Sequence, residues 1–460
     1  MTQTSQSIFL DDPGYVPAPE WTKDLVIYEI APYGFTSPNG VGDGNGSGTF
    51  RSLREKLAYL EDLGITGIWL AGHCPCTNHF YNIKSVYACI RPDALDPALG
   101  DAADFKAMID EAHQRGIRVF LDVITHGVVN SSPLISEHPN WFKPGTWGMT
   151  DYDYSNADFR AWWVNVWTRW VLDFGIDGYR LDVPRHDQMP LWTEVAQRCA
   201  DAGHPIVLFP EIATTYHFSQ RDYSGFSTDM AGEFSREPQF VGQQISCHDE
   251  GWEQPAGQHY RSRGNRGLFA YNLYGTNIPV IMAGEEWFAK QVSLPNLQRY
   301  LYGGGGLGGW MYGSQLQWDQ LNQEPHRQMH HDVRKMLNIR KANRDLLHAD
   351  RAATHIIRVP FSPPGRPLPY ARFIPGIKAI VVVANGSHDM HETQVFTLGI
   401  PLKEMELAGQ CRYRVTNLWT DAVCELDEAA LSRYAIEVPS LYVDGGSRAI
   451  KIEGINPNVA

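Results

Sequence analysis

The sequence predicts an α/β fold, a closed (β/α)8 TIM barrel followed by a C-terminal antiparallel β-sandwich domain, and three observations support this prediction. Short β-rich apolar runs alternate with amphipathic segments from about residue 25 to residue 347, as in a parallel sheet with helical crossovers. Five acidic residues, Asp122, Asp182, Glu211, Asp249 and Glu285, stand at the ends of expected strands, where α/β proteins collect their functional groups. Residues after about 351 form short apolar runs with little helical periodicity, which predicts antiparallel strands.

Six apolar runs predict barrel strands, and helix signals stand between them. The runs are LVIYEI from Leu25, TGIWLAG from Thr66, VFLDVI from Val119, GYRLDV from Gly178, IVLFPEI from Ile206 and IPVIMAGE from Ile278. One helix is expected between a candidate N-cap, Asp101, and a candidate stop, Gly116. Another is expected from Thr49 to Gly64, because leucines recur there at helical spacing. The size of the region suits a closed barrel better than an open sheet.

Two changes in composition divide the chain. Residues 127–157 are rich in Pro, Gly, Ser and Trp and interrupt the pattern after the third strand, which predicts a short inserted domain. We therefore expect a catalytic barrel at 1–126 and 158–350, an inserted domain at 127–157 and a sandwich at 351–460. The rings of the insert, among them Trp141, Tyr152 and Tyr154, either pack on one another or form the wall of a cleft.

Composition excludes several classes of function. The net charge of −13 without a basic block argues against nucleic-acid binding. The longest apolar run, AIVVVA near Ile380, is much shorter than the ~18 residues of a membrane span, and the first residues lack the features of a signal peptide. Seven scattered cysteines indicate free thiols in a reducing compartment. We expect a cytoplasmic protein that binds neither nucleic acid nor membrane.

The stretch GYRLD carries the first chemical signal. Strand side chains alternate between faces, so Arg180 and Asp182 point the same way. A guanidinium lowers the pKa of a neighbouring carboxyl group, whereas the apolar run IVLFP before Glu211 would raise the pKa of that carboxyl. One ionised and one protonated carboxyl group are what cleavage of a glycosidic bond requires. A simple structural pair of Arg180 and Asp182 is the alternative.

Several short motifs in order resemble those of glycoside hydrolase family 13, the α-amylase family. GYRLD followed by His186, PEIAT with Glu211, and SCHDE with His248 and Asp249 match its fourth-, fifth- and seventh-strand motifs. The resemblance implies that Asp182 is the nucleophile, Glu211 the acid/base and Asp249 the residue that stabilises the transition state. The similarity extends from about residue 21 to 455 and implies a (β/α)8 barrel.

Further motifs imply substrate-binding residues, with departures from the family pattern. DVITHG supplies Asp122 but has His126 and Gly127 where Asn and His are usual, and HFYN supplies Tyr81 with Asn82 in place of Asp. In SCHDE, Cys247 replaces the usual Asn. The substrate-binding residues implied are Tyr81, Asp122, Arg180, His186 and His248. His186 is either a residue at a helix N-terminus or a contact to the leaving-group sugar.

The resemblance implies no cofactor and leaves calcium doubtful. The usual calcium ligands include the Asn replaced by His126 and a residue of the insert, where Asp151 remains. A second loop, DGNGS, has Ser47 in place of Asp, and hard cations prefer anionic oxygen ligands. We therefore predict no metal site. Glu285 and Glu286, at the predicted eighth strand, are expected to form ion pairs.

The leading hypothesis is a retaining α-glycoside hydrolase that acts on short α-glucosides or oligosaccharides. A transglycosylase or isomerase with the same three acids is an alternative, because only the group that reaches the intermediate differs. A non-catalytic sugar-binding homologue is a second alternative, since two sugar contacts are lost at Asn82 and Gly127. The partner expected is an α-linked oligosaccharide, and the sequence leaves a homo-oligomer open.

Overall fold

The structure is a computed structural model, and a defined part of the chain is described. The described residues are 16–37, 47–78, 84–146, 148–211, 218–221, 239–245, 248, 265–289, 291–293, 314–364, 369–384 and 391–455.

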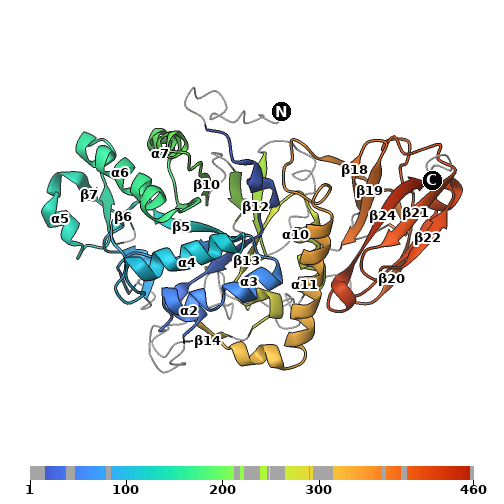
Figure 1. Cartoon of the computed structure of the whole chain (residues 1–460), viewed down its shortest axis with the longest axis horizontal. Helices are drawn as coiled ribbons and strands as arrows, with labels where there is room; N and C mark the ends of the chain where they lie inside the picture. The colour runs from blue at the N-terminus through green and yellow to red at the C-terminus, as the bar shows by residue number, and fades with distance from the viewer. Residues whose placement is uncertain are drawn as a thin grey trace.

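A parallel sheet forms the centre of the molecule and wraps into a barrel (Figure 1). Its strands are β1 (Ile27–Ile30), β2 (Gly67–Leu70), β5 (Arg118–Ile124), β9 (Gly178–Asp182), β10 (Val207–Pro210), β11 (Phe218–Arg221), β12 (Phe240–Gln244) and β13 (Ile278–Met282). Hydrogen-bonded pairing is continuous from β10 through β9, β5, β2, β1, β13 and β12 to β11, and β10 and β11 lie next to each other. Chain order and spatial order therefore agree, which confirms the predicted TIM barrel.

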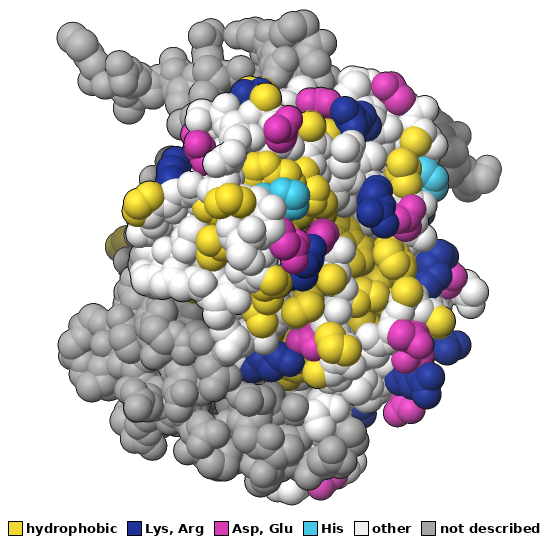
Figure 2. All heavy atoms as spheres, turned by 90° about the vertical axis from the view of Figure 1, so that its left-hand side faces the viewer, with side chains coloured by type: hydrophobic (Ala, Val, Ile, Leu, Met, Phe, Trp, Pro, Cys, Tyr) yellow, Lys and Arg dark blue, Asp and Glu magenta, His cyan; other side chains and the backbone are white. Residues whose placement is uncertain are grey.

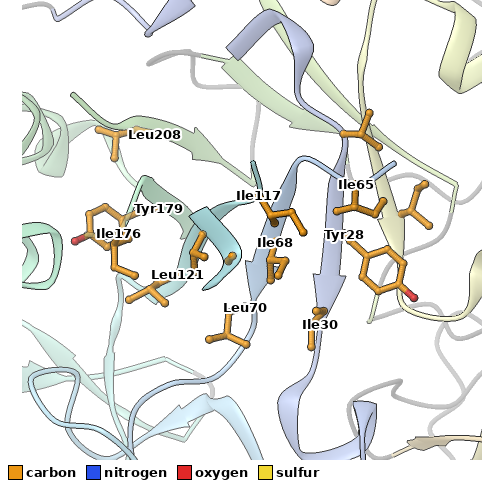
Figure 3. Close-up of a cluster of buried hydrophobic side chains, with 14 of the residues drawn as sticks. Tyr28, Ile30, Ile65, Ile68, Leu70, Ile117, Leu121, Ile176, Tyr179 and Leu208 are labelled. Atoms are coloured by element: carbon orange, nitrogen blue, oxygen red, sulfur yellow. The ribbon is translucent and has the colours of Figure 1, made fainter. Parts of the chain in front are cut away.

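The register of the strands separates an inner face from an outer face. Glu29 pairs with Trp69, and Trp69 pairs with Phe120, so these side chains share the lumen. The lower lumen is apolar and holds Leu25, Ile27, Phe120, Val207, Phe209, Phe240, Ile278 and Val280. The alternate residues face outward into the main core, where Figure 3 shows Tyr28, Ile68, Leu121, Tyr179 and Leu208.

Helices cover the outer face of the barrel. They are α2 (Phe50–Arg54), α3 (Leu57–Leu63), α4 (Ala102–Gln114), α6 (Ala157–Phe174), α7 (Met189–Asp201), α10 (Arg266–Tyr274) and α11 (His326–Ala342). Asp101 caps α4 as predicted, because its side chain accepts a hydrogen bond from the Asp104 N–H. The segment from Thr49 to Gly64 forms two helices rather than one, with Glu55 and Lys56 between them.

The stretch after β5 forms a small sheet of its own. It contains β6 (Gly127–Val128), α5 (Pro133–Glu137), β7 (Phe142–Pro144) and β8 (Thr150–Tyr152) in the strand order β6-β8-β7. Tyr152 stacks on Phe159 and lies at right angles to Tyr154. The rings of the insert therefore pack on one another and on α6.

Antiparallel strands make up the C-terminal part. One sheet contains β16 (His355–Arg358), β18 (Tyr370–Ile374), β19 (Lys378–Ala384), β24 (Ser447–Ile455), β21 (Arg412–Asn417) and β22 (Val423–Leu426). The other contains β17 (Phe361–Ser362), β20 (Gln394–Leu398) and β23 (Tyr434–Val438). An apolar core that includes Val381, Phe396 and Ile450 lies between them, which is consistent with a sandwich. The predicted domain boundaries themselves stay a prediction.

Figure 2 shows the side of the molecule on which α5 and α6 lie, where apolar side chains gather in hollows between charged groups. A cavity between residues 93–102 and α6 has Leu95, Trp170 and Phe174 in its walls, and Asp122, Asp182 and Glu211 are not among its lining residues. Within the described part of the chain, no helix combines the length and the apolar character that a membrane crossing needs.

Candidate active site

The carboxyl ends of β5, β9 and β10 bring charged side chains into the upper lumen. Asp122 pairs in register with Arg180, and the N–H of Glu211 donates to the carbonyl of Leu181 (3.0 Å). Gly178 makes this close pairing of β9 and β10 feasible, because a Cβ there would lie 1.9 Å from the carbonyl oxygen of Val207. Steric contact with β10 thus explains why glycine stands at the first position of the GYRLD motif.

Arg180 lies at the centre of the charged group and is fully buried. Its Nη1 donates to Asp182 Oδ1 (2.7 Å) and to Asp122 Oδ1 (3.1 Å). Its Nη2 lies 3.4 Å from Glu211 Oε1. The pair of Arg180 and Asp182 is therefore part of a larger arrangement, in which a single guanidinium contacts three carboxylates, and the functional role of these residues stays a prediction.

Asp122 binds the side chains around it through both carboxylate oxygens. Its Oδ2 accepts hydrogen bonds from Tyr87 OH (2.8 Å) and from Trp69 Nε1 (3.1 Å), while Oδ1 faces Arg180. Burial raises the pKa of Asp122, and Arg180 and His248 oppose that rise. Asp122 thus holds Arg180 in place from the neighbouring strand, and a contact between Asp122 and a sugar stays a prediction.

The electrostatics of Asp182 differ from the sequence-based expectation. Burial is the largest influence and raises the pKa of Asp182 well above its usual value, and Glu211 and Asp122 add to the rise. Arg180 lowers this pKa, as predicted, but it does not outweigh the other influences. Among the described side chains of this group, one cation contacts three carboxylates, a balance that favours an added proton or a substrate that develops positive charge.

Glu211 has polar rather than apolar partners at its carboxylate. Its Oε2 accepts a hydrogen bond from the N–H of Val183 (2.8 Å), and its Oε1 faces Arg180. Val183 has a φ of 40°, which is strained for a β-branched residue. Thr125 Oγ1 donates to the carbonyl of Asp182 (2.6 Å) and fixes the same turn from β5. The chain after Asp182 is therefore bent so that its N–H holds Glu211.

His248 lies buried in the lumen beside Glu29 of β1. Its Nδ1 is 2.7 Å from Glu29 Oε1. Its ring stacks on Tyr87 at a centroid distance of 5.1 Å and an interplanar angle of 20°. Sequence reasoning missed Glu29 and Tyr87. An acid at the carboxyl end of β1, on the lumen side of its alternation, is the signal that points to Glu29.

The residues present at the expected calcium site do not fit a calcium ion. His126 Nδ1 lies 3.8 Å from Asp151 Oδ1, and the same oxygen accepts from the Thr146 N–H (3.2 Å). Burial lowers the pKa of His126, and neutral imidazole is a poor ligand for a hard cation. At Gly127, a Cβ would lie 2.0 Å from the carbonyl oxygen of Thr150, so β8 excludes the histidine that is usual there.

Some predicted site residues fall outside the described part of the chain. These are Tyr81 and Asp249, together with the departures at Asn82 and Cys247. His186 begins a short 3-10 helix, His186–Gln188, and its side chain is not described. The structure thus brings together Asp122, Arg180, Asp182, Glu211 and His248 from the predicted set.

Comparison with known proteins shows similarity to α-amylases and related enzymes. Residues 32–144 match the family described as the alpha amylase catalytic domain. The intracellular maltogenic amylase of Bacillus subtilis is 27% identical over 244 residues, which are 44% of this chain and 40% of that protein. The cyclomaltodextrinase of Geobacillus thermopakistaniensis is 28% identical over 238 residues, which are 42% of this chain and 39% of that protein. The matched stretch thus spans about two-fifths of these curated relatives.

Solved structures share the whole fold. A maltogenic α-amylase from Thermotoga neapolitana has a TM-score of 0.69 at 19% identity and covers 94% of this chain and 99% of its own. An α-amylase from Geobacillus thermoleovorans in complex with acarbose has a TM-score of 0.71 at 17% identity and covers 95% of this chain and 99% of its own. The catalytic-domain match over residues 32–144, the relatives and the motifs around Asp122, Arg180 and Glu211 all support glycoside hydrolase family 13, the α-amylase family, as the family that this chain resembles.

Proposed function

We propose that the protein is a retaining α-glycoside hydrolase that acts on short α-glucosides or oligosaccharides through a covalent glycosyl-enzyme intermediate. The observation that carries the proposal is the shared contact of Asp182 and Glu211 with Arg180 at the ends of adjacent strands. A two-step displacement requires two carboxyl groups close enough to flank one glycosidic bond. The names of the maltogenic amylase and cyclomaltodextrinase relatives support oligosaccharides as the substrate class.

In the first step, an oxygen of Asp182 attacks the anomeric carbon, and the bond to the leaving oxygen breaks. Glu211 gives its proton to that oxygen. In the second step, Glu211 takes a proton from water, whose oxygen displaces Asp182 from the sugar. The carboxylates of the lumen stabilise the positive charge that develops on the sugar in both transition states.

The remaining roles come from the family motifs. Asp249 would stabilise the transition state, and Tyr81, Arg180, His186 and His248 would hold the sugar. Asp122 would act at the same subsite through Arg180. The relatives named intracellular support a cytoplasmic location, and a homo-oligomer stays open.

A trap of the intermediate tests the mechanism. Glu211→Gln with α-glucosyl fluoride should accumulate a glucosyl adduct on Asp182, because fluoride leaves without a proton whereas the second step lacks its base. Peptide mass spectrometry locates the adduct, and Asp182→Asn with the same reagent is the control. An adduct elsewhere, or wild-type turnover in Asp182→Asn, would contradict the proposal.

A second candidate function is glycosyl transfer or isomerisation with the same three acids. A trehalose synthase from Pimelobacter is 33% identical over 146 residues, which are 31% of this chain and 22% of that protein. Incubation with α-1,4, α-1,6 and α-1,1 linked disaccharides, cyclic oligosaccharides included, distinguishes the two. Free glucose with a retained anomeric configuration in the first product supports hydrolysis, whereas dominant transfer or isomerised products support the second candidate.

A further inference from the structure

Glu29, in β1, is a carboxylate that no step of the proposed mechanism uses. It is fully buried in the lumen, beside Trp69 in register. Its Oε1 lies 2.7 Å from His248 Nδ1, and its Oε2 accepts a hydrogen bond from Gln244 Nε2 (2.8 Å). A buried carboxylate is costly unless its oxygens are hydrogen-bonded. The two contacts therefore both stabilise Glu29 and fix the groups that make them.

The contact with Glu29 determines which nitrogen of His248 carries a proton. An ionised carboxylate offers only acceptors, so the hydrogen bond requires a proton on Nδ1. The other ring nitrogen, Nε2, then carries no proton in the neutral ring and is a hydrogen-bond acceptor. A carboxylate on one nitrogen of a histidine is a common way to set both the tautomer and the ring orientation.

The orientation of the His248 ring also reaches Arg180. The ring stacks on Tyr87 (5.1 Å between centroids) and meets the ring of Trp69 edge-on (5.8 Å). Tyr87 OH donates to Asp122 and accepts from Arg180 Nη1 (3.2 Å). A rotation of His248 would therefore move the tyrosine that helps to hold the guanidinium against Asp182.

We propose that Glu29 is a positioning residue that fixes the tautomer and the orientation of His248, and through Tyr87 the position of Arg180. The kinetic part of this inference rests on the proposed function, because turnover of an α-glucoside is its readout. The tautomer of His248 is a readout that needs no substrate.

The test separates hydrogen bonding from packing with two substitutions of similar volume. Glu29→Gln keeps an oxygen that accepts from His248 Nδ1, whereas Glu29→Met fills the space without an acceptor. We expect Glu29→Met to lower kcat about 10–100-fold with a smaller change in KM, and Glu29→Gln to stay within about tenfold of the wild type. Glu286→Gln is the matched control, because Glu286 is another fully buried carboxylate, held by Tyr28 and Tyr59. It should leave kcat unchanged.

Nitrogen-15 shifts of the imidazole rings supply the second readout, with the His248 signals assigned by their loss in His248→Gln. We expect a protonated Nδ1 in the wild type and in Glu29→Gln, and a change to the Nε2-protonated form or to averaged signals in Glu29→Met. Equal kcat in Glu29→Met and Glu29→Gln, or His248 signals that do not change, would overturn the inference. If the wild type turns over no α-glucoside, the proposed function fails and the nitrogen shifts alone decide the role of Glu29.

Discussion

Carboxylates in two regions of the barrel differ in the groups that compensate their charge. In the lumen group, Asp122, Asp182 and Glu211 surround Arg180. In the wall group, which lies behind the sheet, Glu286 accepts hydrogen bonds from Tyr28 OH (2.8 Å) and Tyr59 OH (2.6 Å). The first group thus shares a cation, whereas the second relies on neutral donors. The lumen group can therefore respond to charge that develops on a bound substrate. The hydrogen bonds of Glu286 instead serve to hold that side chain in position.

The two groups also share a feature of the backbone. Glu286 Oε2 accepts from the N–H of Gly284 (3.0 Å), and Gly284 has a φ of 90°. Glu211 accepts from the N–H of Val183, whose φ is 40°. Each carboxylate is therefore held by an N–H from a left-handed residue, but only the wall group uses the residue type that adopts this conformation without strain.

Removal of Arg180 should have the largest effect on the lumen group. Arg180→Gln removes the cation that contacts the buried Asp122 and Asp182 and the partly exposed Glu211, so we expect a loss of about 3–5 kcal/mol in the free energy of unfolding and about a 10²–10³-fold loss in kcat. Urea unfolding and initial rates measure the two. The control is Arg198→Gln, because Arg198 pairs with Glu194 (2.6 Å) on the exposed surface and should change stability by less than about 1 kcal/mol. A stability of Arg180→Gln near that of the control would show that Arg180 does not compensate the carboxylates.

Glu286 should give the wall group a measurable pH dependence. Burial raises the pKa of Glu286 to about 7, against the hydrogen bonds that lower it. The native state therefore keeps a proton that the unfolded state loses near its ordinary pKa of 4.5, so the stabilisation is complete below that pH. It is lost as pH rises through about 7, by about 3 kcal/mol in total. Glu286→Gln should abolish this slope in urea titrations between pH 4 and 8, whatever its effect on stability at one pH.

Asp182→Asn should stabilise the protein while it removes turnover. The raised pKa of Asp182 means that its protonated form favours the native state, and this contribution is lost as pH rises through that pKa. A neutral side chain of the same shape avoids the loss, so we expect a gain of about 1 kcal/mol at neutral pH. Thermal unfolding at pH 5 and pH 8 measures the gain, which should be larger at pH 8. A decrease in stability at pH 8 would mean that the ionised form is the favoured one.

The sequence predicts the fold well where apolar alternation is strong. All six apolar runs coincide with strands of the barrel, and Gly116 follows α4 with a φ of 73°. Apolar alternation did not indicate β12, because Gln243 and Gln244 are buried polar residues within that strand, and only the seventh-strand motif SCHDE that follows it pointed to a strand there. The helix expected from Thr49 to Gly64 divides at Glu55, which periodicity alone does not show because all four leucines of the stripe stay buried.

The sequence motifs predicted which acidic residues belong to the candidate site. They did not predict the hydrogen bonds that hold these residues and their neighbours in position. Motif order places Asp122, Arg180, Asp182 and Glu211 together, whereas the contact of Glu29 with His248 joins residues 219 positions apart. Glu286 was expected in an ion pair and instead accepts hydrogen bonds from two tyrosines. Such errors arise because a sequence shows which residues carry charge and not which distant donors the fold brings to them.

Substitutions at Val183 give the smallest expected effect and compare the two backbone turns directly. Val183→Gly would make the lumen turn resemble that of Gly284, since glycine adopts a positive φ without strain, whereas Val183→Ala keeps the Cβ and the strain. We expect the glycine variant to be about 1 kcal/mol more stable than the alanine variant, the reverse of the usual order within regular structure. Urea unfolding of the two variants measures this difference. The glycine variant should also lose kcat, by a few-fold, because a flexible turn no longer holds the N–H against Glu211. An alanine variant that is the more stable of the two would show that the turn at Val183 carries no strain.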